Sequence, residues 1–175
     1  MNSYISNFLQ SINDKKSKVA IVDEASMYGV KQIRSALYEY MALIKKLGLD
    51  PRERIVLLGE RNAESILFFH ALLLSDLVPT LIDRTLPKDQ VKILSNDNNR
   101  FTTDNSLVGP RTTKIPLISE LLLKNEVGNF QFSTQALEDA KLFATHTSGT
   151  TGLPKLVTYS NKNITWVVDE YKKLY

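Results

Sequence analysis

The stretch "RIVLLGERNAESILFFHALLLSDLVPTLID", residues 54–83, decides the fold class of this 175-residue chain. Its first six residues contain an apolar run that does not alternate with polar residues, which is typical of a strand buried on both faces. Asn62 is a suitable N-cap for the apolar helical stretch that follows, and residues 78–83 are again strand-like. A strand, a helix and a second strand in this order predict a βαβ unit and therefore a parallel sheet.

The flanking segments extend this pattern in both directions. Residues 19–23 and 100–104 are short strand-like runs, and Pro87 is placed to open a short helix. Residues 30–49 carry apolar side chains three or four positions apart, as on one face of an amphipathic helix: Ile33, Leu37, Met41, Ile44 and Leu47. We therefore predict an α/β fold, with a parallel βαβ layered sheet and helices on both faces.

The last part of the chain changes character after residue 140. Two strand-like runs, "LFAT" and "KLVTY", are joined by a loop, and a helical tail follows with Asn161 or Asn163 as its cap. On this tail we expect three side chains to be buried by helix packing: Trp166, Val167 and Tyr171. We predict that residues 1–140 form an N-terminal α/β subdomain and that residues 141–175 begin the next one.

The composition excludes several classes of function. The chain is 43% hydrophobic and has 22 basic and 19 acidic residues, scattered without a basic block, so nucleic acid is not an expected partner. It has no cysteine and two histidines far apart in the sequence, which gives no metal site. Without a signal peptide or an apolar run long enough to cross a membrane, we expect a soluble, cytoplasmic protein.

The loop lies within "THTSGTTGLPKLVTY", residues 145–159. Gly149 and Gly152 allow the backbone to approach a ligand closely, and the serine and threonines add donors. Lys155 adds a cation, and together these groups describe a cradle for polyphosphate. An ordinary hairpin loop is the alternative, but a chance match to "SGTTGxPK" is expected in only roughly one window in 10⁸. The Walker loop is excluded because Lys155 follows Pro154 and leads into a strand rather than a helix.

This loop resembles the phosphate loop of the adenylate-forming superfamily, which includes acyl- and aryl-CoA synthetases, luciferases and the adenylation domains of nonribosomal peptide synthetases. The family pattern, T-S-G-[ST]-T-G-x-P-K-G, matches residues 147–155 throughout. Residues 47–83 and the proline-started helix after them are also similar to the family. The resemblance thus implies the adenylate-forming fold for most of the chain.

The resemblance also implies a reaction, in which a carboxylate attacks the α-phosphate of ATP to give an acyl-adenylate and pyrophosphate, usually followed by transfer to a thiol. ATP and Mg²⁺ are the implied cofactors, and a carboxylic acid and coenzyme A or a carrier-protein thiol are the implied partners. Lys155 would act catalytically by neutralising the leaving pyrophosphate. The residues implied to bind the β- and γ-phosphates are Thr147, Ser148, Gly149, Thr150, Thr151, Gly152 and Lys155.

The sequence departs from the family at several positions. The glycine that follows the lysine is Leu156 here, a common histidine is replaced by Asn161, and the family's A-G-A turn between helix and strand is Ser75-Asp76-Leu77. The family's later motifs, including Y-G-x-[ST]-E and the catalytic lysine of a C-terminal domain, are not found in these 175 residues. We therefore predict an N-terminal portion of an adenylating ligase that is inactive by itself, with self-association or a complementing chain. The alternative is a non-catalytic binding or interaction module on the same scaffold.

Overall fold

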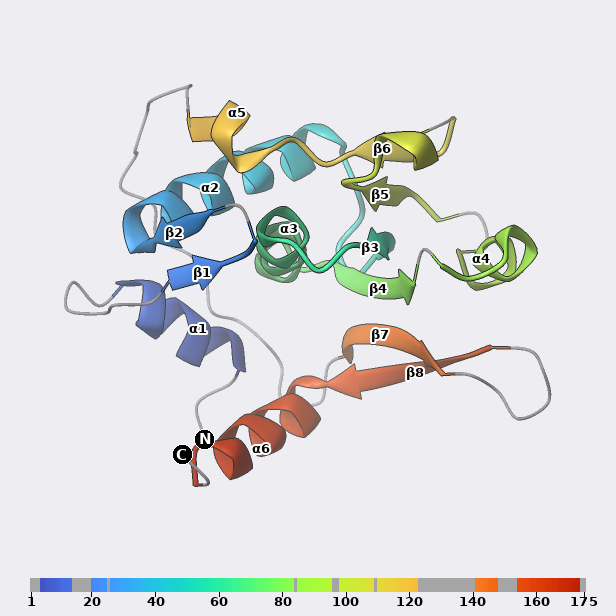
Figure 1. The fold of residues 1–175 in the computed structure, drawn as a ribbon. Helices are drawn as coiled ribbons and strands as arrows, with labels where there is room; N and C mark the ends of the chain where they lie inside the picture. Colours follow the sequence, from blue (N-terminus) through green and yellow to red (C-terminus); the bar gives the residue numbers. More distant parts are fainter. Residues whose placement is uncertain are drawn as a thin grey trace.

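A computed structural model describes residues 4–13, 20–24, 26–83, 85–95, 98–108, 110–122, 141–147 and 154–173. Figure 1 shows a twisted sheet with helices packed on it and a small separate hairpin. In chain order the elements are α1 (Tyr4–Asn13), β1 (Ala20–Val22), β2 (Met27–Gly29), α2 (Val30–Lys46), β3 (Arg54–Gly59), α3 (Ala63–Leu74), β4 (Val78–Asp83), α4 (Lys88–Ser95), β5 (Arg100–Thr102), the 3₁₀ turn η1 (Asn105–Leu107), β6 (Thr112–Lys114), α5 (Ile118–Leu122), β7 (Lys141–Thr147), β8 (Lys155–Ser160) and α6 (Asn161–Tyr171).

The main sheet has the strand order β6-β5-β3-β4-β7-β8, and β1 pairs with β2 in a separate antiparallel hairpin. The strands from β6 to β7 pair in parallel, while β8 runs antiparallel to β7. Because β3 and β4 pair from Arg54 with Val78 to Gly59 with Asp83, their carboxyl ends meet at one edge. The predicted parallel sheet is thus confirmed, with one antiparallel strand at its end.

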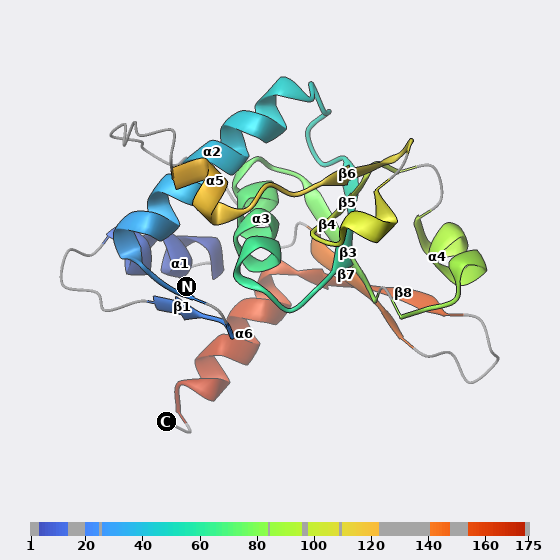
Figure 2. The same cartoon turned by 45° about the horizontal axis from the view of Figure 1, so that its top comes forward.

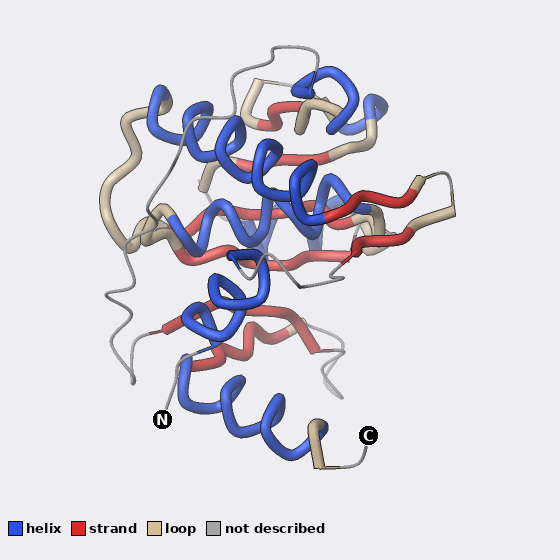
Figure 3. Tube along the Cα trace, turned by 90° about the vertical axis from the view of Figure 1, so that its left-hand side faces the viewer, coloured by secondary structure: helices blue, strands red, loops and turns tan. Residues whose placement is uncertain are grey.

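Helices cover both faces of the sheet, as predicted. Helices α2, α3 and α5 lie on one side and α4 lies on the other, which Figures 1 and 2 both show. Turned by 90°, most of the helices lie in front of the strands (Figure 3). The side chains of β3 point alternately to the two faces of the sheet. Ile55 and Leu57 belong to the core under α3, whereas Val56 and Leu58 belong to the cluster under α4.

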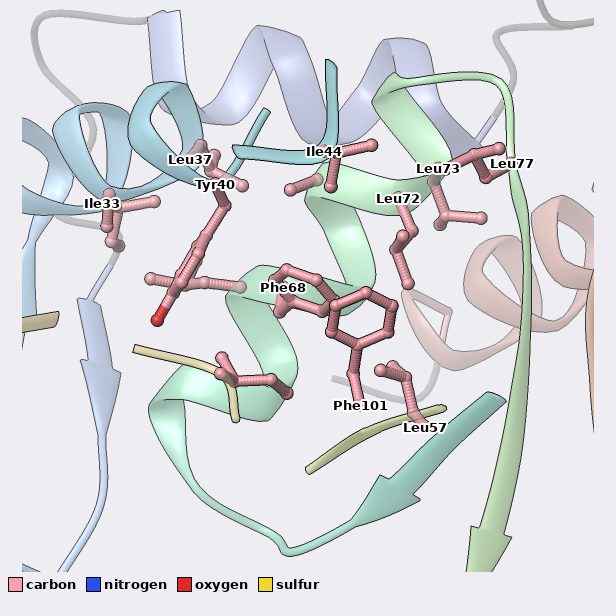
Figure 4. Close-up of a cluster of buried hydrophobic side chains, with 14 of the residues drawn as sticks. Ile33, Leu37, Tyr40, Ile44, Leu57, Phe68, Leu72, Leu73, Leu77 and Phe101 are labelled. Carbon is pink, nitrogen blue, oxygen red and sulfur yellow. The ribbon is translucent and has the colours of Figure 1, made fainter. Parts of the chain in front are cut away.

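The larger core is centred on Phe68 of α3, which is fully buried. Its ring lies 5.3 Å from the ring of Tyr40, edge to face, and 5.0 Å from that of Phe101 (Figure 4). The three aromatic residues come from α2, α3 and β5, so one aromatic column joins two helices to the sheet. The Tyr40 hydroxyl is satisfied inside this core because it donates to the carbonyl oxygen of Pro116 at 2.7 Å.

Two predictions at helix ends have different outcomes. Asn62 caps α3 as expected, since its side chain accepts a hydrogen bond from the Ser65 N–H at 3.0 Å. The cap of α6 is Ser160 rather than Asn161 or Asn163, and its hydroxyl accepts from the Asn163 N–H. Ser160 takes this role because β8 runs into α6 without a break, so the last residue of the strand is also the cap of the helix.

The predicted burial of three side chains on α6, Trp166, Val167 and Tyr171, is wrong. Trp166 is 60% exposed, Val167 39% and Tyr171 62%. The buried residues of α6 are instead the polar Asn161 and Thr165. The predicted subdomain boundary between residues 140 and 141 stays a prediction, because residues 123–140 lie outside the described residues.

Candidate functional site

The β7–β8 hairpin holds the two ends of the predicted phosphate loop. Within the hairpin, His146 pairs with Leu156 and Thr147 pairs with Lys155 at the open end. Thr147 and Lys155 are both exposed, and Lys155 makes no ion pair with another described residue. The structure therefore brings together two of the seven predicted site residues; the other five, Ser148, Gly149, Thr150, Thr151 and Gly152, lie outside the described residues.

The base of the hairpin is fixed to the rest of the fold. Phe143 of β7 stacks on Tyr159 of β8, with ring centres 5.0 Å apart, and meets Phe69 of α3 edge to face. Leu156, which replaces the family's glycine, packs against the apolar cluster under α4. Both strands are thus held by side chains near the loop, so the positions of Thr147 and Lys155 follow from the core.

The hairpin opens at the carboxyl edge of the parallel strands, where β3, β4, β5 and β7 also end. Ligands of open α/β sheets bind at this edge, because the loops that leave it surround a crevice. At this edge α3 follows β3 on one face and α4 follows β4 on the other. The chain therefore leaves β3 after Gly59 towards one face of the sheet and leaves β4 after Asp83 towards the other. A crevice forms at the edge of a sheet where two adjacent strands are followed by helices on opposite faces.

Two cavities flank this edge, and both are lined by Glu60, Arg61 and Asp83. The first, of about 580 Å³, lies between α3, β4 and β7 and has mainly apolar walls, with Thr145 and His146 at the hairpin side. The second, of about 820 Å³, is more polar and lies beneath the β1–β2 turn. These residues were not predicted from the sequence, although their position at or directly after the ends of two adjacent parallel strands is the signal that could have found them.

The turn between β3 and α3 separates the two cavities and is tied by hydrogen bonds. The Thr103 hydroxyl donates to a Glu60 carboxylate oxygen at 2.8 Å, and the Asn62 amide donates to the Thr103 hydroxyl at 3.1 Å. The Asp23 carboxylate accepts from the Ala63 N–H at 3.3 Å and so lies at the N-terminus of α3. Because this end of the helix already has Asn62 and Asp23 as acceptors, it is not an open anion site.

Asp83 presents a stable negative charge at the end of β4. Its carboxylate accepts hydrogen bonds from the Thr85 N–H at 2.8 Å and from the Thr85 hydroxyl at 2.7 Å. These hydrogen bonds hold the pKa of Asp83 below its ordinary value. The edge of the sheet thus combines an ionised carboxylate at β4 with the exposed lysine of the hairpin.

His70 lines the apolar cavity but is held in place by structural contacts. Its Nδ1 donates to the Ile66 carbonyl oxygen at 2.7 Å, and its Nε2 accepts from the Tyr4 hydroxyl at 2.8 Å. The ring stacks on Phe8 at 4.1 Å. Loss of water on burial lowers the pKa of His70 to about 4, against the smaller opposing effect of the Ile66 hydrogen bond, so the ring is neutral near pH 7. These contacts give His70 a structural role in packing α1 against α3.

The described residues contain neither a cluster of metal-ligating side chains nor a membrane-spanning helix. No group of three or more histidine or acidic side chains in these ranges is arranged to hold a metal ion. No helix in the described part of the chain is long and apolar enough to cross a membrane.

The fold and the hairpin define a class of protein: an α/β chain with a loop rich in glycine, serine and threonine at the carboxyl edge of its sheet. The sequence model of the AMP-binding enzyme family matches residues 8–175, and the chain belongs to this family. No curated protein matches the chain.

The chain shares its fold with solved structures that include N-terminal domains or subdomains of longer proteins. The N-terminal subdomain of Klebsiella oxytoca NpsA, in complex with 3-hydroxyanthranilyl-AMSN, superimposes with a TM-score of 0.73 at 14% identity, over 93% of this chain and 41% of that one. The o-succinylbenzoate CoA synthetase (MenE) from Bacillus subtilis, bound to the acyl-adenylate OSB-AMP, superimposes with a TM-score of 0.72 at 19% identity, over 91% of this chain and 42% of that one. The inhibitor-bound N-terminal domain of FACL13 from Mycobacterium tuberculosis superimposes with a TM-score of 0.71 at 18% identity, over 92% of this chain and 45% of that one. The chain therefore spans about two fifths of the length of these structures.

Proposed function

We propose that this chain is the N-terminal part of an ATP-dependent acyl-adenylating ligase and that its β7–β8 hairpin binds the β- and γ-phosphates of ATP. The observation that carries the proposal is the pairing of Thr147 with Lys155 at the exposed, open end of the hairpin. A hydroxyl donor and a cation at the two ends of a loop rich in glycine and threonine suit an anionic ligand. Membership of the AMP-binding enzyme family supports the same assignment.

The proposed roles follow from the chemistry of the side chains. ATP, when bound, would supply the activated phosphoanhydride, so that a carboxylate forms a bond to the α-phosphorus and the bond to pyrophosphate breaks. Lys155 would neutralise charge on the departing pyrophosphate, and the Thr147 hydroxyl would donate a hydrogen bond to a phosphate oxygen. We propose that the loop residues Ser148 to Gly152 add donors to the same phosphates.

The proposed magnesium ion belongs with the phosphates. Mg²⁺ is commonly bound by one or two carboxylates together with substrate phosphates. Asp83 is an ionised carboxylate at this edge, on the strand beside β7. We assign it no contact with the metal; in the proposal Mg²⁺ is held in a complete enzyme that also provides the carboxylic acid site and the thiol acceptor.

Titration calorimetry with ATP tests the assignment of the loop. Loss of a charge-assisted hydrogen bond from Lys155→Ala should weaken binding by about ten- to a hundredfold. Lys92→Ala on the exposed face of α4 is the matched control and should bind ATP as the unmodified chain does. Equal affinity of all three proteins would overturn the phosphate assignment.

Pyrophosphate exchange tests whether the chain is active by itself. We expect no exchange by residues 1–175 above the background of Lys155→Ala, because the family motifs that follow the loop are not in this sequence. Exchange well above that background would show that the predicted inactivity is wrong. The alternative, a non-catalytic binding or interaction module, also predicts no exchange. If that module binds anions through the loop, Gly149→Val should abolish phosphate binding, and an unchanged affinity would count against it.

A further inference from the structure

Helix α1 links the next helix in the chain, α2, to α6, which is far from it in the sequence. It lies between α2 and α6 (Figure 1) and contacts both. Its apolar side is buried in the larger core through Ile5, Leu9 and Ile12. A helix of 10 residues is marginal in water by itself, so its helical structure depends on these contacts.

The first residue of α1 makes three hydrogen bonds to other helices. The Tyr4 N–H donates to the Asn161 side-chain oxygen at 3.2 Å and to the Thr165 hydroxyl at 3.0 Å, both on α6. The Tyr4 hydroxyl donates to His70 of α3 at 2.8 Å. The N–H groups in the first turn of a helix have no partner within that helix, so α6 here supplies the acceptors for α1.

The same contacts account for the unusual burial of α6. Asn161 is 2% exposed and Thr165 4% exposed, although both are polar, while apolar residues of this helix are exposed. Thr165 also donates to the Asn161 carbonyl oxygen at 2.8 Å, so its hydroxyl both accepts and donates a hydrogen bond within this contact. Buried polar side chains cost free energy unless they are hydrogen-bonded, so the orientation of α6 is defined by the end of α1.

Helix α6 begins where the phosphate-loop hairpin ends. Strand β8 runs from Lys155 to Ser160, and Ser160 is itself the cap of α6. Any rotation or shift of α6 therefore acts directly on the strand that carries Lys155. The hairpin is held at β7 by the sheet and at β8 by α6.

We propose that α1 is a brace that positions α6 and, through it, the β8 side of the loop hairpin, with Tyr4 as the positioning residue that joins α6 to α3. The effect on ATP rests on the proposed function of the loop, whereas the mechanical role of α1 does not. This proposal predicts that removing a contact between α1 and α3 loosens α6, although that contact does not involve α6.

Hydrogen exchange of the full chain without nucleotide tests this statement. Tyr4→Phe removes only the hydroxyl contact to His70, and Thr165→Val removes the acceptor on α6. Each variant should speed exchange of the α6 amides by about fivefold, the effect expected for one intramolecular hydrogen bond, while the amides of β3 are unchanged. Tyr171→Phe, at an exposed tyrosine of α6, is the matched control and should leave exchange unchanged.

Two outcomes would overturn the brace. In one, Tyr4→Phe leaves the α6 amides at their original exchange rates, so α1 and α6 are only neighbours. In the other, α6 and β3 speed up equally, so the hydroxyl contributes to global stability alone. Because the experiment contains no ATP, failure of the brace is distinguishable from failure of the phosphate assignment.

Discussion

Acidification should destabilise the fold through His70, because this imidazole is packed against Tyr4, Phe8 and Phe69. Its pKa is lowered from 6.5 to about 4 in the folded chain. Between these values the unfolded chain binds the proton more tightly, so the stabilising contribution is complete above pH 6.5 and is lost as the pH falls towards 4. The full loss is about 3 kcal/mol, of which about 2 kcal/mol is gone at pH 5.

Urea unfolding at pH 7 and pH 5 measures this contribution. In His70→Gln the titrating group is absent, so the loss of unfolding free energy between the two pH values should be about 2 kcal/mol smaller than in the unmodified chain. An equal pH dependence of His70→Gln and the unmodified chain would refute the reasoning.

Three further outcomes are expected. Phe68→Ala should lower the unfolding free energy by about 4 kcal/mol in urea titrations, because it empties the centre of the aromatic column; a loss below about 1 kcal/mol would contradict that. Asn62→Ala should cost about 1 kcal/mol by the same measurement, since it removes the cap of α3, and an unchanged midpoint would count against the cap. The exposed Trp166 and Tyr171 predict self-association, which light scattering would show as a mass that rises with concentration; a monomer at high concentration would contradict it.

The central βαβ unit could be predicted from sequence because several signals agree there. The bounds predicted for the strands at residues 54–59 and 78–83 are those of β3 and β4. Non-alternating apolar runs, the Asn62 cap and the turn after α3 all favour a strand, a helix and a second strand. The local sequence preferences therefore agree with the tertiary structure. The family was predictable for a different reason, since the loop motif fixes many positions within a short window.

The first helix could not be predicted in this way. Residues 4–13 contain apolar side chains at helical spacing, but the segment is short and polar enough that its helical structure depends on α2, α3 and α6. The exposure of Trp166 and Tyr171 was missed because spacing identifies an apolar stripe but not its partner. On α6 the tertiary hydrogen bonds to Tyr4, which no local pattern encodes, select which face is buried.

The most direct test of the central claim is an amide NMR titration of the chain with pyrophosphate. We expect saturable shifts at Thr147 and Lys155 on the two strands of the hairpin, with the amides of α4 unaffected and the response lost in Lys155→Ala. Shifts that cluster away from the hairpin, or a Lys155→Ala protein that responds as the unmodified chain does, would contradict the phosphate assignment.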